Sequence, residues 1–97
     1  MAENAFKTKE LIPELKSMFP GCFVLHLDPN EIQGIPDLLV LYKNKWATLE
    51  AKDSAKATHR PNQDYYVDVM NGLSFSAFIY PQNKDEVLYD LYKYFTS

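Results

Sequence analysis

Acidic residues in the middle of the chain have the type and spacing of a site that could bind a metal ion. The strand-like runs 37–42 and 45–52 flank residues 43–44 and predict a β-hairpin that turns there. Folding the hairpin about this turn places Asp37 directly opposite Glu50. Cross-strand partners have Cβ atoms about 4.5–5.5 Å apart, so both carboxylates can reach one divalent cation.

Two further residues complete the predicted site. Lys52 follows Glu50 by two positions and shares its face of the strand, because strand side chains alternate. Ala51 is expected to face the core, and its backbone carbonyl offers a third oxygen ligand. Such an all-oxygen set suits Mg²⁺, or Mn²⁺ as a substitute, rather than Zn²⁺. A cation there would activate water and neutralise charge on a phosphoryl oxygen, and Lys52 could orient that water. The predicted chemistry is phosphodiester hydrolysis.

The alternative interpretation is that these charges are ordinary surface groups. Acids at strand ends beside a lysine usually form at most a weak salt bridge. The adjoining run 38–41, however, is continuously apolar, as in a strand that is buried on both faces. A carboxylate at the end of such a strand pays a desolvation cost. We therefore favour the functional interpretation.

The elements that must position these residues follow from hydrophobic periodicity and from turn residues. Apolar positions at helical spacing, with a stop at Pro20-Gly21, predict a first helix over 5–19. Pro13 lies inside it, so we expect the helix to kink there or to begin nearby. The other predicted elements are a strand over 22–27, the two hairpin strands, a helix from Pro61 to a cap at Gly72, a strand over 75–80, and a helix that Asn83 and Glu86 open as a capping box and that runs through Phe95. This order indicates one α/β domain over 1–97.

Length and composition agree with this assignment. The chain has 97 residues, of which 46% are hydrophobic and 24% charged, and a single Cys22, which excludes disordered, disulfide-rich and cysteine-based zinc classes. The formal net charge of −3 would not by itself attract nucleic acid, although the region 43–60 is basic. There is neither a signal-peptide pattern at the start nor an apolar run of roughly 18 residues. We expect a cytoplasmic protein without membrane contact.

Nearly the whole chain resembles the PD-(D/E)XK nuclease superfamily. The resemblance rests on Gly34-Ile35-Pro36-Asp37, on Glu50-Ala51-Lys52 across the hairpin, and on Gln63 in the following helix. It is nearest to the small VRR-NUC type domains and to the Holliday-junction resolvases of phages and archaea. It implies a restriction-endonuclease-like core, in which a small mixed sheet is flanked by helices in the order αβββαβ(α).

The resemblance also implies a role for each matching residue. Asp37 and Glu50 would bind the metal, and Lys52 would serve the attacking water. Gln63 would help to shape the site from the next helix. The implied activity is metal-dependent cleavage of DNA.

Family members also place a glutamate on the first helix, where it completes a second metal position or holds metal-bound water. Glu10 is the favoured candidate, because of its distance from the end of the predicted helix. Glu14, one turn later, is the competitor, and Pro13 between them leaves the choice open.

Basic residues near the predicted site are candidate contacts for DNA phosphates. They are Lys56, His59 and Arg60 in the loop that precedes the second helix, together with Lys43 and Lys45 at the hairpin turn. The alternative is an ordinary solvated loop, and for His59 we favour it over a catalytic base. His26, flanked by apolar residues on a strand, is expected to be structural.

The expected enzyme is a homodimer. The last predicted helix carries aromatic residues at positions 89, 92, 94 and 95, which cannot all share one buried stripe. Two sites related by a twofold axis would match the symmetry of a four-way DNA junction. We therefore expect a Mg²⁺-dependent endonuclease of a phage or mobile element that acts on branched DNA. The alternatives are a less selective or nicking nuclease and, in another class, a non-catalytic DNA-binding module.

Overall fold

The protein is an α/β fold built on a small mixed sheet, as expected. The computed structural model describes residues 3–97. Its elements are α1 (Glu3–Phe6), the π-helical turn η1 (Lys7–Leu11), α2 (Ile12–Met18), β1 (Phe23–His26), β2 (Leu38–Tyr42), β3 (Lys45–Ala51), α3 (Gln63–Leu73), β4 (Ser76–Ile79) and α4 (Lys84–Thr96). The strand order is β1-β2-β3-β4, with β4 parallel to β3 and the other neighbours antiparallel. Among the described residues, no helix is both long and apolar enough to cross a membrane.

The hairpin has the predicted register. Leu38 pairs with Leu49 and Tyr42 with Lys45, so the chain turns at residues 43–44. Lys43 takes a left-handed backbone conformation there, with φ of 56°. This register brings the residues just before β2 beside the end of β3.

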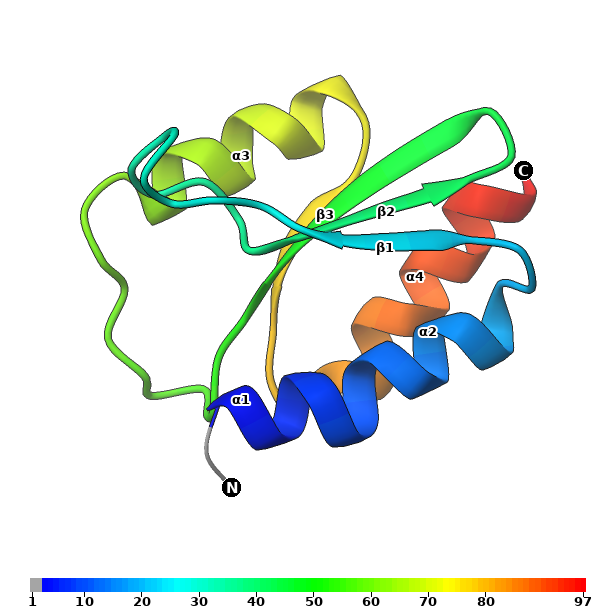
Figure 1. Ribbon diagram of the computed structural model, residues 1–97, viewed down its shortest axis with the longest axis horizontal. Coiled ribbons are helices and arrows are strands. Elements are labelled where there is room, and N and C mark those ends of the chain that lie inside the picture. The colour runs from blue at the N-terminus through cyan, green and yellow to red at the C-terminus, as the bar shows by residue number, and fades with distance from the viewer. Residues whose placement is uncertain (1–2) are drawn as a thin grey trace.

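Different helices pack on the two faces of the sheet. In Figure 1, α3 lies above the sheet, and α1, α2 and α4 lie below it. The lower face is the core, to which Leu38, Val40 and Leu49 contribute fully buried side chains. The upper face carries polar residues at Thr48 and Glu50, both of which contact α3. The sheet therefore holds a polar layer under one helix.

Pro13 lies in the first turn of α2, so an α-helical segment begins close to it as expected, although helical residues also precede it. Figure 1 shows α1, η1 and α2 as one continuous rod. Within it the Ile12 N–H donates to the carbonyl of Lys7, five residues earlier. Such a π-helical turn leaves a carbonyl without a helical donor, so the missing N–H of a following proline costs little.

Helix α3 begins later than predicted, at Gln63 rather than Pro61. Asn62 has a left-handed backbone, with φ of 71°, and packs against Gly34. A Cβ on Gly34 would lie 2.7 Å from the Asn62 Cβ, so the loop before β2 approaches the start of α3 too closely for any side chain. Gly72 is not a cap, because the helix continues to Leu73.

The start of α4 also differs from the prediction in detail. Asn83 precedes the helix as expected, but its side chain makes no capping bond. Its Oδ1 instead accepts from the Tyr80 N–H at 2.8 Å, and its Nδ2 donates to the Phe78 carbonyl at 3.1 Å. The prediction of a capping box was wrong, because the Asn83 side chain hydrogen-bonds to the backbone at the end of β4 instead.

Candidate active site

Four of the predicted residues, Asp37, Glu50, Lys52 and Gln63, meet in a pocket at the end of the hairpin away from its turn. The pocket has a volume of about 250 Å³. It is lined by Lys7, His26, Leu27, Pro29, Ile35, Asp37, Glu50, Lys52, Arg60 and Gln63. Four segments therefore build it: the first helix, the end of β1 with the loop that follows it, the hairpin, and the start of α3 with the residue Arg60 before it.

Asp37 directly precedes β2, and each of its carboxylate oxygens accepts a hydrogen bond. Its Oδ1 accepts from the backbone N–H of Ala51 at 3.3 Å, and its Oδ2 accepts from the Lys7 ammonium at 3.1 Å. The backbone carbonyl of Asp37 accepts from the Leu27 N–H, which ties the residue to the chain that follows β1. Asp37 is thus attached to both of its neighbours in the sheet.

Glu50 and Lys52 come from the end of β3 and are almost completely buried, with exposed fractions of 4% and 5%. The Lys52 ammonium lies 3.8 Å from Glu50 Oε2, which is an ion pair rather than a short hydrogen bond. The same ammonium donates to the Thr58 carbonyl at 3.2 Å. Burial and these contacts hold both charges in place.

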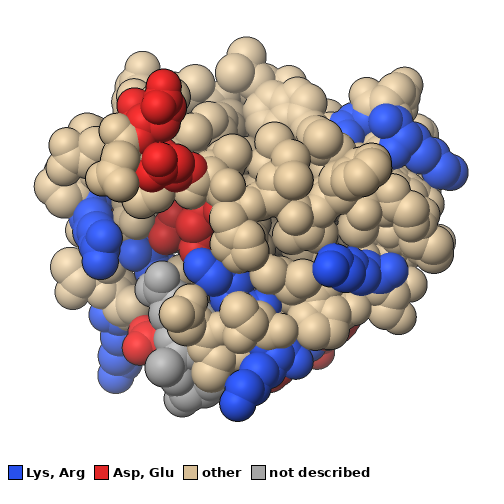
Figure 2. Space-filling view, in the orientation of Figure 1, with Lys and Arg blue, Asp and Glu red and all other residues tan. Residues whose placement is uncertain are grey.

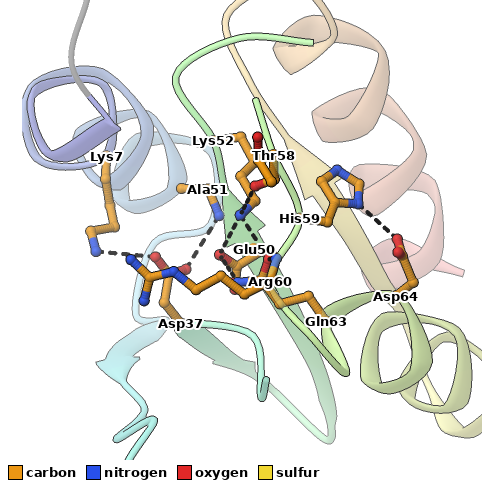
Figure 3. A network of polar contacts seen from close by, with 10 residues as sticks. All are labelled: Lys7, Asp37, Glu50, Ala51, Lys52, Thr58, His59, Arg60, Gln63 and Asp64. Atoms are coloured by element: carbon orange, nitrogen blue, oxygen red, sulfur yellow. Dashed lines mark hydrogen bonds and ion pairs between the residues drawn. The ribbon is translucent and has the colours of Figure 1, made fainter. Parts of the chain in front are cut away.

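Gln63 bridges the two buried charges from the first turn of α3. Its Oε1 accepts from Lys52 Nζ at 2.7 Å, and its Nε2 donates to Glu50 Oε2 at 3.1 Å. Oε1 also accepts from the backbone N–H of Arg60 at 2.8 Å. Figure 3 shows this bridge; Lys7 reaches Asp37 from the first helix, and the Arg60 side chain extends toward Asp37 from beside Gln63. The amide orients the lysine, the glutamate and the loop at once.

The donor set fits a hard divalent cation that keeps part of its water shell. Within residues 3–97, no group of three or more His, Cys, Asp and Glu side chains is placed to hold a metal. An ion here would depend on Asp37, Glu50, a backbone oxygen such as that of Ala51, and water. Mg²⁺ is commonly bound by one or two carboxylates with several waters and substrate phosphate oxygens, so two carboxylates are sufficient.

The first helix presents a lysine to the pocket in place of the expected glutamate. Neither Glu10 nor Glu14 lines the pocket. The Glu14 carboxylate accepts a hydrogen bond from Lys84 at the start of α4, and this bond raises the pKa of the Lys84 ammonium. Glu10 lies close enough to Lys84 for its charge to raise that pKa further.

Lys7 was missed by the sequence reasoning, although a signal for it exists. It precedes Leu11 by four residues and Leu15 by eight, and both leucines are fully buried. A lysine in line with an apolar helix stripe points toward the inside of the fold. The spacing therefore indicated that Lys7 would need a partner there.

The candidate DNA-binding residues do not all lie at the pocket. Arg60 lines it, whereas Lys56 is exposed and does not. The His59 ring stacks on Phe78 at 4.0 Å between ring centroids, and its Nδ1 lies 2.8 Å from Asp64 Oδ1. That contact points away from the pocket in Figure 3. His59 therefore anchors the loop to β4 and α3.

The two lysines at the hairpin turn lie at the far end of the sheet. The Lys45 ammonium donates to the carbonyl oxygens of Tyr94 and Ser97 at 2.7 and 3.0 Å, close to the end of α4. Lys43 is exposed and lies over the Tyr42 ring. About six residues of strand, roughly 20 Å, separate this turn from Asp37.

His26, expected to be structural, is exposed and lines the pocket. The pocket thus brings together two carboxylates, three cationic side chains, one imidazole and a bridging amide.

Comparison of the chain with family models, with curated proteins and with solved structures finds no match.

Proposed function

We propose that the protein is a Mg²⁺-dependent endonuclease that hydrolyses phosphodiester bonds in DNA. The observation that carries this proposal is the meeting of Asp37, Glu50 and Lys52 in one pocket, with Gln63 bridging the last two. This is the residue set that the PD-(D/E)XK resemblance implies. The sheet, three antiparallel strands followed by a parallel one after a helix, is compatible with the nuclease core that the resemblance implies.

The buried positions of these residues suit the proposed chemistry. A divalent cation bound by Asp37 and Glu50 would supply an activated water and charge neutralisation. Lys52 is held by Gln63 and Thr58 before any substrate arrives, so its charge needs no reorganisation to stabilise a pentavalent phosphorane-like transition state. Lys52 would also orient the attacking water.

The charge and shape of the pocket favour a nucleic acid strand over a small anion. Three cations, Lys7, Lys52 and Arg60, face two carboxylates in a protein whose formal net charge is −3. A second hollow of about 460 Å³ continues from the pocket and shares Arg60 and Gln63 with it. Its lining adds the amide side chains of Asn30 and Gln33, which can hydrogen-bond to sugars or bases. A chain of nucleotides could occupy both hollows.

A homodimer acting on branched DNA belongs to the same proposal. Phe23 and Leu25 on β1 are exposed on the side of the sheet where α3 packs, and Tyr65, Val69 and Leu73 form an exposed stripe along α3. We call these five residues the apolar patch. In Figure 2 the region over α3 and the strands is broad and mostly uncharged. Two copies could meet there through apolar contacts, and a twofold axis would pair their active sites for the two cuts that a four-way junction needs.

The proposal is tested first by cation binding. Mg²⁺ that binds only the folded protein should raise its thermal stability with concentration, by about 2.7 kcal/mol at one hundred times the dissociation constant. Asp37→Asn should abolish the shift, whereas Asp53→Asn, an exposed acid outside the pocket, should keep it. A flat response of the wild type to both Mg²⁺ and Mn²⁺ would contradict the proposal.

Two other functions remain as outcomes of the experiments. Cleavage of linear and branched DNA alike would indicate a less selective or nicking nuclease with the same site. DNA binding without cleavage, by a well-folded protein, would indicate a non-catalytic binding module.

A further inference from the structure

Lys7 holds the carboxylate on which the proposed cation site depends. Its ammonium lies 3.1 Å from Asp37 Oδ2, and its side chain is only 12% exposed. Both groups line the pocket, with Arg60 also among its walls. A partly buried ion pair of this kind interacts more strongly than one on the open surface.

The local backbone aims Lys7 at this position. The π-helical turn η1 begins at Lys7, whose carbonyl accepts the N–H of Ile12. The buried side chains of Phe6 and Leu11 fix the helix against the core on either side of it. Such turns occur often at functional sites, because they re-aim side chains within a helix.

A carboxylate oxygen that accepts an ammonium cannot also bind a divalent cation in the same direction. A cation that approached Asp37 Oδ2 from the side on which the Lys7 ammonium lies would displace that ammonium. Lys52 differs from Lys7 here, because it donates to two fixed acceptors, Gln63 and Thr58, and is buried. Lys7 has a flexible four-carbon stem, so its ammonium can move aside without a change in the backbone.

We propose that Lys7 is an exchangeable counter-charge, which neutralises Asp37 in the cation-free protein and contacts a DNA phosphate once a cation has taken its place. This inference rests on the proposed function. It makes Lys7 a positioning and substrate-binding residue, and it explains why a lysine faces a site that must attract a cation. The exchange keeps Asp37 paired with a positive charge in both states. It also makes the Lys7 ammonium available to a DNA phosphate only when a cation is bound.

The exchange predicts opposite effects of one substitution on two ligands. Lys7→Met removes the competitor, so Mg²⁺ should bind roughly two- to fivefold more tightly by calorimetry without DNA. The same variant should bind a short DNA duplex more weakly when Ca²⁺ replaces Mg²⁺ to slow hydrolysis. The slope of log K against log salt should fall by about 0.9, which corresponds to one lost phosphate contact. The control is Lys9→Met, at an exposed lysine of the same turn. It should change neither the dissociation constant for Mg²⁺ nor the salt slope of DNA binding.

A second variant keeps the inference testable if Lys7→Met folds poorly by circular dichroism. Lys7→Arg retains the charge and can pair with Asp37 through two hydrogen bonds. It should weaken Mg²⁺ binding while preserving the salt slope of DNA binding. If Lys7 had only a structural role, the two variants would not change the affinity for Mg²⁺ in opposite directions.

The inference is overturned if wild type and Lys7→Met bind Mg²⁺ equally, or if the salt slope of DNA binding is the same in both. In that case cation binding by the wild type would leave the proposed function standing. A wild type that binds no divalent cation would instead refute the proposed function, and with it the role of Lys7.

Discussion

At the scale of single residues, Gln63 has the widest influence on the site. Its amide makes hydrogen bonds to Lys52, to Glu50 and to the backbone of Arg60. Gln63→Ala should lower the free energy of unfolding by about 1–3 kcal/mol, because buried partners lose their hydrogen bonds. It should also lower cleavage strongly, because the Lys52 ammonium is no longer held.

The comparison that checks this prediction is Gln33→Ala, an exposed amide that lines only the second hollow. Denaturant unfolding and single-turnover cleavage should be measured for both variants. Cleavage by Gln63→Ala at the wild-type rate would show that the amide does not position Lys52.

The hairpin register, in which Leu38 pairs with Leu49 next to Asp37 and Glu50, could be predicted from the sequence because a two-residue turn determines the register of a hairpin. The place of Gln63 came from the family resemblance. The helix pattern indicates that Lys7 faces inward, but it does not identify Asp37 as its partner, which lies thirty positions away. The structure likewise separates Lys43 and Lys45 from the pocket, a separation that net charge along the sequence could not reveal.

At the scale of elements, the close approach of Gly34 to the start of α3 controls the position of Gln63. Gly34→Ala would introduce a side chain at φ of 92° and 2.7 Å from the Asn62 Cβ. The strained backbone alone should cost about 1–3 kcal/mol. Cleavage should fall as well, because α3 must move away from the hairpin.

Gly72→Ala is the matched control for this change. Gly72 lies in α3, and a Cβ there would meet no atom within 4 Å. This substitution should raise the free energy of unfolding by about 0.4–1 kcal/mol and leave cleavage unchanged. If both glycine variants were equally stable and active, the contact between Gly34 and α3 would not matter.

Helices α2 and α4 are joined by the Lys84–Glu14 ion pair, which gives a pH-dependent contribution to stability. The pKa of Lys84 is raised above its ordinary 10.5, chiefly by the hydrogen bond to Glu14. A raised pKa in the folded state means that the contribution is complete below about pH 10 and is lost as pH rises through the folded pKa. Urea unfolding of wild type and Lys84→Met should therefore differ at neutral pH and converge at strongly alkaline pH. A difference that stays constant over this range would contradict the assignment.

The order of elements could be predicted because hydrophobic periodicity and turn residues reflect local backbone preferences. The errors have a common origin in contacts between distant segments. Asn83 bonds to the end of β4 instead of capping α4, and the start of α3 depends on Gly34. Pro13 is tolerated through a π-helical turn, which no local propensity indicates.

At the scale of the whole molecule, the apolar patch predicts self-association. Phe23 and Leu73 are exposed to 66% and 73%, on β1 and α3 respectively. Leu73→Glu should place two like charges near each other across a twofold interface and shift the protein toward monomer. Light scattering coupled to size-exclusion chromatography measures this shift.

Ser17→Glu serves as the control for self-association, because Ser17 is exposed and lies on α2, on the other side of the sheet. It should leave the mass unchanged. A wild type that is monomeric at all accessible concentrations would refute the dimer and remove the support for paired incisions.

The central claim is that Asp37, Glu50 and Lys52 form a metal-dependent nuclease site. The most direct test is cleavage of a labelled four-way junction, a matched linear duplex and a single strand, with Mg²⁺, Mn²⁺ or EDTA. Wild type and Lys52→Ala should be compared at equal fold content. We predict cleavage by the wild type with either cation, none with EDTA, and a loss of about 100-fold or more in Lys52→Ala with DNA binding retained. Equal cleavage by both proteins, or no cleavage of any DNA by folded wild type, would contradict the account.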